Sequence, residues 1–231
     1  MFRFVSLLSP EIAKRFRGFN PGNASHFTER SKTKQNGEGG YKTMRDRIKD
    51  IFLESIQIKE ELMRTSIVQI IEIADLIIDC LKKNGKVILF GNGGSASDCQ
   101  HIAAELIGRF KKDRTALAAI ALTTNTSVIT SLANDYGYEI VFAKQIEALG
   151  QKNDIIIGIS TSGKAKNVAC GIKQAKKMGL KTVALTGGDG GELAKLADVS
   201  LLVPSAVTAR IQEAHITIGH IICELVEESL C

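Results

Sequence analysis

The sequence has none of the features of a disulfide-stabilised or membrane-spanning protein. Its five cysteines are odd in number and include no CxxC pair, which argues against a disulfide framework and for a reducing compartment. No uninterrupted apolar run reaches the roughly 18 residues that a membrane-spanning helix needs. We therefore expect a cytoplasmic protein with no membrane partner.

The chain also has little net charge outside its first residues. The formal charge of all 231 residues is +5, but residues 1–43 hold eight basic and three acidic side chains, and residues 44–231 hold 22 of each sign. A neutral body offers no positive surface to a polyanion, so we expect no nucleic-acid partner. The length and the 44% hydrophobic content suit one medium-sized globular domain.

Residues 1–43 differ in composition from everything that follows. They carry five of the nine phenylalanines and two of the three prolines, and residues 31–40 show no periodicity. A basic cluster follows the short apolar stretch at the start instead of preceding it, which is the wrong order for a secretory signal. We interpret residues 1–43 as a disordered or non-native extension, with a targeting segment as the alternative, and residues 44–231 as the folded domain.

From Met44 onward, apolar patterns typical of helices and of strands alternate. Two helical stretches come first, and the second runs from Thr65 to Leu81. Five short runs rich in valine and isoleucine then follow, separated by helical patterns, which is typical of parallel strands buried on both faces. They span 86–90, 117–122, 154–159, 182–185 and 199–203. We predict an α/β fold, a doubly wound three-layer αβα sandwich with a five-stranded parallel sheet and added N-terminal helices, with ligands beyond the carboxyl ends of the strands.

Two of the predicted strands end in loops that suit a phosphate group. One runs into Gly91-Asn92-Gly93-Gly94-Ser95 and the other into Ser160-Thr161-Ser162-Gly163, and a helix follows each. Glycines allow close approach, and the N–H groups of a helix start attract a phosphate. The first loop alone is equally well explained as a tight turn, because it matches neither GxGxxG nor a Walker sequence. Three consecutive hydroxyls have little packing value, so the second loop is the better candidate; we interpret the glycine-rich turn at 186–191 as structural.

The helix after the first loop and the last helix carry three of the four histidines. His101 and Glu105 lie four positions apart and project from one helix face, although a surface pair at this spacing is more common than a catalytic pair. On the last helix, rotation favours Glu213 over Gln212 as the neighbour of His220. Spacing alone therefore leaves the partner of His220 open.

Five segments, in this order, resemble the phosphoheptose isomerase branch of the sugar isomerase (SIS) domain family: GNGGSASDCQHIAAEL, LANDYGYEIVFAKQ, GISTSGKAKNV, LTGGDGG and ARIQEAHITIGH. The resemblance extends over residues 44–231, which we therefore expect to form one SIS domain. It implies an isomerase that converts sedoheptulose 7-phosphate to D-glycero-D-manno-heptose 7-phosphate through an enediol, at the start of heptose-precursor biosynthesis. It also implies a homotetramer, and a last helix that is apolar on more than one side, at about 208–228, agrees.

The resemblance also implies roles for particular residues. Glu105 and His220 form the acid–base pair, with Glu105 as the carbon base and His220 as the acid. His101, Glu105, Gln212 and His220 are the ligands of one zinc ion per subunit. Besides Glu105 and Gln212, the implied substrate contacts are Asn92, Gly93, Gly94, Ser95, Arg109, Asn134, Asp135, Ser160, Thr161 and Ser162.

Two positions depart from the family pattern. Ala165 stands where some members carry a serine that contacts phosphate, and Ala209 where some carry an aspartate. Lys164 is a candidate replacement for the missing serine. The alternatives to an enzyme are a relative that binds a replication initiator and has lost the acid–base pair, and a phosphosugar-sensing domain. The simultaneous presence of Glu105 and His220 favours the isomerase.

Overall fold

The computed structural model describes residues 43–231, so the interpretation of residues 1–43 falls, apart from Thr43, outside the described residues. Helix α2 (Met44–Thr65) comes first, and α3 (Ile67–Lys82) follows. The hydroxyl of Thr43 accepts a hydrogen bond from the Asp46 backbone N–H at 3.2 Å. A side-chain cap of this kind satisfies one of the free donors at a helix start, which explains why α2 begins at Met44.

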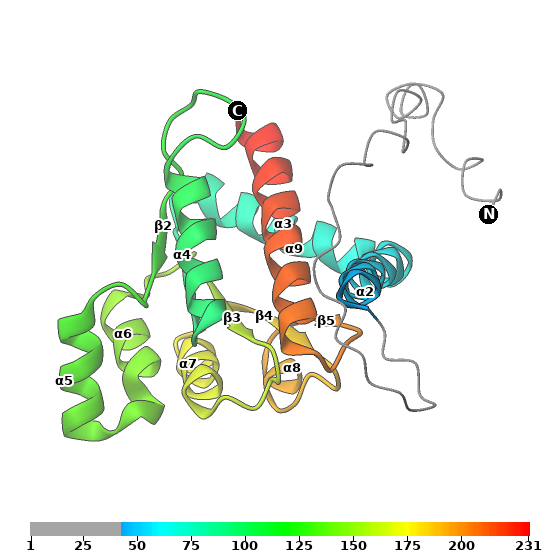
Figure 1. Ribbon diagram of the computed structural model, residues 1–231. Helices are drawn as coiled ribbons and strands as arrows, with labels where there is room; N and C mark the ends of the chain where they lie inside the picture. Colours follow the sequence, from blue (N-terminus) through cyan, green and yellow to red (C-terminus); the bar gives the residue numbers. More distant parts are fainter. Residues whose placement is uncertain (1–42) are drawn as a thin grey trace. The chain divides into compact units, whose positions relative to one another are not determined.

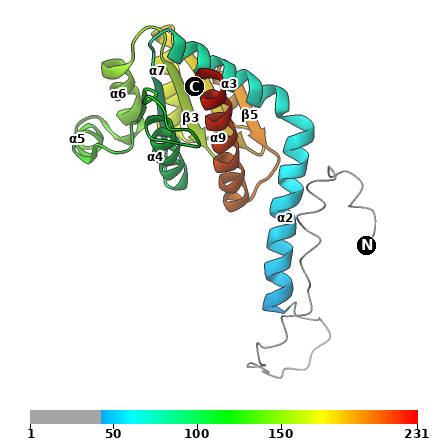
Figure 2. The same ribbon diagram turned by 90° about the horizontal axis from the view of Figure 1, so that it is seen from above.

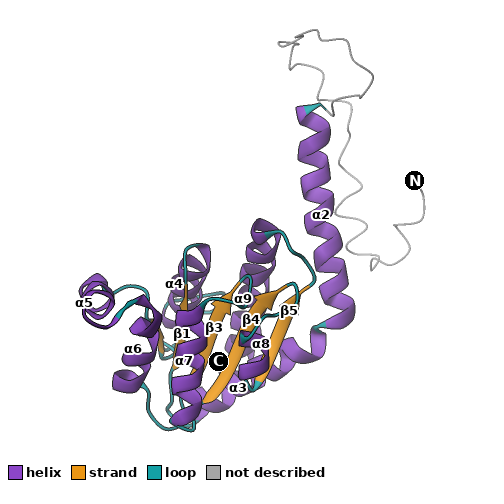
Figure 3. Cartoon of the chain, turned by 90° about the horizontal axis from the view of Figure 1, so that it is seen from below, coloured by secondary structure: helices purple, strands orange, loops and turns teal. Residues whose placement is uncertain are grey.

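The five predicted strands form one parallel sheet (Figure 3), with the order β2-β1-β3-β4-β5. Their bounds are β1 (Val87–Gly91), β2 (Ala119–Ala121), β3 (Ile155–Ser160), β4 (Lys181–Gly187) and β5 (Val199–Val203). The prediction of a five-stranded parallel sheet is therefore confirmed. Only β2, at the edge of the sheet, is clearly shorter than its apolar run.

Helices cover both faces of the sheet and complete the predicted three layers (Figure 1). In chain order they are α4 (Gly94–Ile107), α5 (Thr126–Tyr136), the 3-10 helix η3 (Tyr138–Ile140), α6 (Val141–Leu149), α7 (Lys166–Lys177), α8 (Leu193–Leu196) and α9 (Thr208–Leu230). Val87 and Leu89 of β1 pack with α3, α4 and α9, whereas Ile88 and Phe90 pack with α6 and α7. Because both faces are covered, the strand reads as a continuous apolar run.

The order of the strands fixes where a ligand can enter. The chain passes from β1 to β2 on one side and then returns to β3 on the other side of β1. The loops after β1 and β3 therefore flank the point where the direction of winding reverses, which is the usual ligand site of an open α/β sheet.

Helices α4 and α9 lie side by side on the same face of the sheet (Figures 1 and 2). Gly219 on α9 permits this close approach, because a Cβ there would overlap the side chain of Ile102 on α4. None of the helices in the described part of the chain combines the length and apolar character that a membrane span requires.

Candidate active site

Three of the predicted site residues meet where α4 and α9 touch. His101 and Glu105 project from one face of α4, and their Nε2 and Oε1 atoms lie 3.1 Å apart. Nε2 of His220, on α9, lies 3.3 Å from the same nitrogen of His101. The structure thus brings together the predicted acid–base pair and joins it to a second histidine.

This contact geometry suits a cation. His101 Nε2 cannot donate a proton to Glu105 and accept one from His220 at once, because a protonated imidazole nitrogen has no free lone pair in its plane. The candidate ligand atoms of the three residues all lie within 4.8 Å of one another. Two imidazoles and one carboxylate form a donor set that zinc commonly takes.

Gln212, the fourth predicted metal ligand, lies elsewhere in this chain. It precedes His220 by a little over two turns of α9, roughly 12 Å along the helix axis. Its side-chain amide packs on Gly94, the first residue of α4, where a Cβ would overlap it. Of the four residues implied by the resemblance, the structure therefore gathers three and places Gln212 beside the loop after β1.

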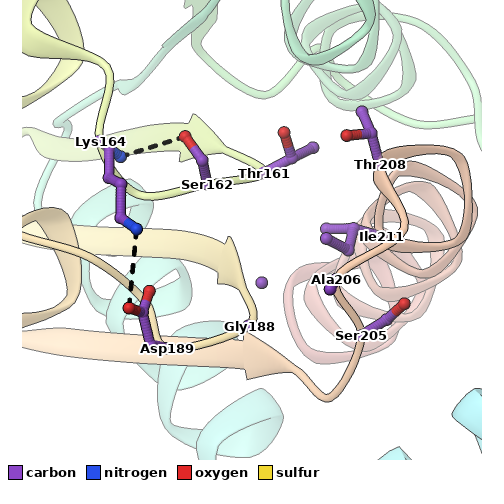
Figure 4. A pocket seen from close by; sticks show the side chains of 10 residues that line it. Thr161, Ser162, Lys164, Gly188, Asp189, Ser205, Ala206, Thr208 and Ile211 are labelled. Atoms are coloured by element: carbon purple, nitrogen blue, oxygen red, sulfur yellow. Dashed lines mark hydrogen bonds and ion pairs between the residues drawn. The ribbon is translucent and has the colours of Figure 1, made fainter.

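A cavity of about 310 Å³ opens beside the loop that follows β3 (Figure 4). Thr161 and Ser162 line it, together with Thr208 and Ile211 at the start of α9. The backbone N–H of Lys164 donates to Ser162 Oγ at 3.2 Å, so this hydroxyl is held beside the cavity. Ser160, the last residue of β3, is buried and is not among the lining residues.

The glycine-rich turn after β4 supports this loop, as we interpreted, and also contributes to the cavity. Gly163 has a φ of 62°, and a Cβ there would overlap the carbonyl of Gly190. The backbone carbonyl of Gly163 accepts a hydrogen bond from the N–H of Leu193 at 3.1 Å. Gly188 and Asp189 line the cavity opposite Ser162, which the sequence analysis did not anticipate. The sequence did contain a signal for this contact, because the glycine-rich turn at 186–191 follows a strand, as the hydroxyl loop does.

The loop after β1 is fixed by an amide pair. The Asn92 amide donates to Asn167 Oδ1 and accepts from Asn167 Nδ2, both at 2.9 Å, and the Tyr138 hydroxyl donates to Asn92 Oδ1 at 3.1 Å. Asn167 is buried at the start of α7. The side chain of Asn92 is thus tied to α7. Ser95 is buried, whereas Gly93 is exposed and has a φ of 56°.

Arg109, Asn134 and Asp135 are not among the residues that line the cavity. Asn134 and Asp135 are exposed at the end of α5, where Asn134 Nδ2 donates to Asp135 Oδ1 at 2.8 Å. Helix α5 stands at the β2 edge of the sheet, on the side away from α9 (Figure 1). Arg109 follows α4 and is exposed. Arg109 directly precedes Phe110, whose ring packs on His220.

Two titratable groups with shifted pKa values lie on the helices that form the site. Asp98, on α4, has its Oδ2 buried without a hydrogen-bond partner among the described residues. Burial raises the pKa of the Asp98 carboxyl to about 6, although nearby His101 opposes the rise. His215, on α9, is fully buried, with Nε2 3.0 Å from the carbonyl oxygen of Thr186. Burial lowers the pKa of His215 to about 4, although the contact with Thr186 opposes the fall.

His215 and Glu213, two further polar residues of α9, contact other parts of the fold instead of the histidine cluster. His215 faces β4, and Glu213 forms an ion pair with Arg210 one turn earlier on α9. Arg210 also donates to the backbone carbonyl of Ile51 on α2 at 3.0 Å. Helical rotation favoured Glu213 as the neighbour of His220, but its side chain instead pairs with the arginine that joins α9 to α2.

Comparison with known proteins defines the class of this protein. A family model described as the SIS domain matches residues 52–187, more than half of the chain. The solved structure of phosphoheptose isomerase from Neisseria gonorrhoeae superimposes with a TM-score of 0.77 at 43% identity, covering 80% of this chain and 100% of that chain. The one from Francisella tularensis gives 0.78 at 38% identity, covering 81% and 100%. The chain belongs to the SIS domain family.

Individual relatives narrow the family to one branch. Phosphoheptose isomerase from Aquifex aeolicus is 53% identical over 188 residues, which are 81% of this chain and 98% of that protein. The relative from Thermodesulfovibrio yellowstonii is 51% identical over 185 residues, covering 80% and 92%. Within the SIS domain family, the chain is therefore a member of the phosphoheptose isomerases, and the predicted resemblance is confirmed.

Proposed function

We propose that this protein is an isomerase that converts sedoheptulose 7-phosphate to D-glycero-D-manno-heptose 7-phosphate, the first step of heptose-precursor synthesis, with Glu105 and His220 as its acid–base pair. The observation that carries the assignment is the convergence of both side chains on His101, at 3.1 and 3.3 Å. A carboxylate and an imidazole on two adjacent helices are the two kinds of group that a proton transfer between neighbouring carbons requires.

The reaction moves one proton between adjacent carbons through an enediol. The Glu105 carboxylate takes the proton from C1, and the electron pair of the C1–H bond becomes the C1=C2 bond. His220 gives a proton to the carbonyl oxygen on C2 as that bond forms. The hydroxyl on C1 then returns a proton to His220 as the C1=O bond forms, and Glu105 gives its own proton to C2, which yields the aldehyde and restores both groups. No atoms are gained or lost, so no redox partner is needed.

We further propose that His101, Glu105 and His220 hold one zinc ion per subunit. Their ligand atoms lie within 4.8 Å of one another, and the donor types suit zinc. When bound, the ion supplies Lewis-acid stabilisation of negative charge on the substrate oxygens. The resemblance adds Gln212 to the ligand set, although in this chain the Gln212 side chain packs on Gly94.

The phosphate of the substrate binds in the cavity beside the loop after β3. The hydroxyls of Thr161 and Ser162 line this cavity, and the backbone N–H groups at the start of α7 follow it. N–H groups at a helix start and neutral hydroxyl donors suit a phosphate monoester. Lys164 reaches the same cavity, where its ammonium lies 3.7 Å from Asp189 Oδ2. The remaining substrate contacts that the resemblance implies, Arg109, Asn134 and Asp135 among them, stay part of the proposal.

We expect the protein to be a cytoplasmic homotetramer. The apolar side chains that are exposed on α2 and the first turns of α3 are Met44, Ile48, Ile51, Phe52, Leu53, Ile56, Met63, Ile67, Val68 and Ile71. An exposed apolar surface of this extent is typical of an interface between subunits.

In light scattering, Phe52→Glu is expected to yield a smaller species, whereas the charge reversal Lys177→Glu, on exposed α7 surface, is expected to leave the mass unchanged.

The second candidate function is a non-catalytic SIS-domain protein that binds a replication initiator. Such a protein has no need for Glu105 and His220 to meet at one point, and the neutral charge of residues 44–231 gives no support for contact with DNA. The convergence of the two side chains therefore favours the isomerase.

The deciding experiment is turnover of sedoheptulose 7-phosphate by wild type and Glu105→Gln. General acid–base catalysis contributes on the order of 100- to 10,000-fold in rate, so we expect Glu105→Gln to lower kcat by a factor in that range. Each protein is assayed after metal removal and again with zinc restored. Wild-type protein that shows no turnover with zinc present, and does not differ from Glu105→Gln, would refute the proposed function.

A further inference from the structure

A buried ion pair links the two helices that carry the proposed acid–base pair. Arg114 lies in the segment after α4, and its Nε donates to Glu227 Oε1 on α9 at 2.9 Å. The two side chains are only 3% and 2% exposed. Charges this deeply buried are costly unless further hydrogen bonds surround them. Those further bonds show what the pair holds in place.

Arg114 uses its other donors on the last turn of α4. Its guanidinium NH1 group donates to the backbone carbonyl of Leu106, and its NH2 group to that of Glu105, each at 2.9 Å. Carbonyls in the last turn of a helix have no partner within the helix, and a cation is favoured there. Arg114 therefore fixes the backbone of the residue that we propose as the carbon base.

Glu227 holds the segment between α4 and Arg114. Its carboxylate accepts the backbone N–H groups of Phe110 at 3.3 Å, Lys111 at 2.8 Å and Lys112 at 2.9 Å. Burial alone raises the pKa of Glu227, but the N–H groups of Lys111 and Lys112 and the Arg114 side chain outweigh it, so the pKa is lowered and the carboxylate stays charged.

The segment held by Glu227 also contacts the proposed acid. The rings of Phe110 and His220 lie 5.8 Å apart between centroids, at an interplanar angle of 40°. Glu227 follows His220 by about two turns of α9, so both project from nearly the same helix face. Arg114 and Glu227 thus fix both sides of the catalytic cluster, the Glu105 backbone on α4 and the ring that packs on His220.

We propose that Arg114 and Glu227 are positioning residues for the isomerisation, which set the separation of Glu105 and His220 by tying the end of α4 and residues 110–112 to α9. This inference rests on the acid–base roles proposed above. Displacing a catalytic group by about 1 Å can cost on the order of 100-fold in rate, so weakening the pair lowers kcat. The phosphate cavity does not include the pair, so KM is retained.

The test compares Glu227→Gln with a matched control, a second buried ion pair that forms no hydrogen bond with α4 or α9. Asp154 forms an ion pair with Lys86 and is itself 2% exposed, so Asp154→Asn also removes one buried charge. At a temperature where circular dichroism shows both variants folded, we expect Glu227→Gln to lower kcat by about tenfold or more, with KM within about twofold of wild type. Asp154→Asn is expected to keep the wild-type kcat. Equal kcat for Glu227→Gln and wild type, or equal losses in both variants, would overturn the proposal.

Phe110→Leu decides the matter if Glu227→Gln fails to fold, because Phe110 is only half-buried. We expect this variant to lower kcat by about threefold or more at unchanged KM, since the ring that positions His220 is lost; a wild-type kcat would overturn the proposal. Glu105→Gln, assayed alongside, separates the two levels of inference. If it is fully active, the acid–base assignment has failed; if it is inactive while Glu227→Gln and Phe110→Leu are normal, the positioning role alone has failed.

Discussion

The two ends of the parallel sheet differ in how completely their buried carboxylates are hydrogen-bonded. At the amino end, Asp154 accepts the Lys86 backbone N–H at 2.9 Å, the Lys86 ammonium at 2.6 Å and the Gln151 N–H at 2.8 Å. Asp198 is likewise held there by the N–H and hydroxyl of Thr182 and by Lys176. Every carboxylate named here has at least three donors.

At the carboxyl end, groups are left without partners. Asp98, on the helix that begins at the carboxyl end of β1, has a buried oxygen with no hydrogen-bond partner in the described part of the chain. Gly93 and Gly163 hold positive φ angles of 56° and 62° in the loops that flank the point of reversal. A buried polar group without a partner marks a place where a ligand can supply the missing contact. Positive φ angles do not separate the two ends, because Asn84 and Asn153 have them at the amino end. The comparison assigns stability to the amino end and binding to the carboxyl end.

The largest effect on stability is expected from Asp154→Asn. Removing one partner of a buried ion pair costs several kcal/mol, and because the Lys86 side chain is 26% exposed we expect a loss near the lower limit, about 3 kcal/mol in the free energy of unfolding. Urea unfolding followed by circular dichroism measures it. If this variant kept its stability and instead lost activity, the assignment of stability to the amino end of the sheet would be wrong.

The next largest effect is the pH dependence that comes from His215. Its pKa is lowered to about 4 when folded, so the unfolded chain takes up a proton that the folded chain does not. Stability is therefore full above pH 6.5 and falls as the pH drops from about 6.5 to 4, by up to roughly 3 kcal/mol. We expect His215→Gln to show a shallower loss over this range in urea titrations; an unchanged slope would contradict the assignment.

Weaker binding is expected when the hydroxyls of the phosphate loop are removed. A lost hydrogen bond to a charged group is worth about 1.5 kcal/mol or more, so Ser162→Ala should raise KM about tenfold with little change in kcat. Ser200→Ala, at a hydroxyl that donates to the carbonyl of Ala194 and lies outside the cavity, is the control. Equal KM values for wild type and Ser162→Ala would remove this loop from the binding site.

The smallest effect is expected at Asp98, and it has the opposite sign. Because the folded pKa of Asp98 is raised to about 6, its ionised form destabilises the fold above pH 6, and the penalty disappears as the pH falls toward 3.8. Asp98 is only partly buried, so solvent screens the effect. We expect Asp98→Asn to raise Tm by about 1–2 °C at pH 7 and not at pH 4. A lower Tm at pH 7 would show that the carboxylate is satisfied after all.

The sequence predicted those parts of the molecule that depend on local pattern. Runs such as 154–159 identify strands because covering both faces requires continuous apolar residues. The pairing of His101 with Glu105 follows from one helical turn. Contacts between distant segments leave no local pattern: Arg114 and Glu227 are separated by 113 positions, and Asn92 and Asn167 by 75.

The position of Gln212 likewise could not be predicted from local sequence pattern. Its assignment as a metal ligand came from resemblance, and helical rotation favoured Glu213 instead. In the structure, Gln212 packs on Gly94 and Glu213 pairs with Arg210. Both outcomes depend on how α9 packs against α4 and α2, which the sequence of α9 alone does not determine.

The most direct test of the proposed chemistry is turnover of sedoheptulose 7-phosphate in D₂O, followed by NMR. An enediol mechanism with Glu105 as the carbon base exposes the transferred proton to solvent, so we predict deuterium at C2 of the product formed by wild type. Both turnover and deuterium incorporation should fall together by on the order of 100-fold or more in Glu105→Gln. Product that forms at the wild-type rate in Glu105→Gln, with the same deuterium content, would contradict the assignment of Glu105.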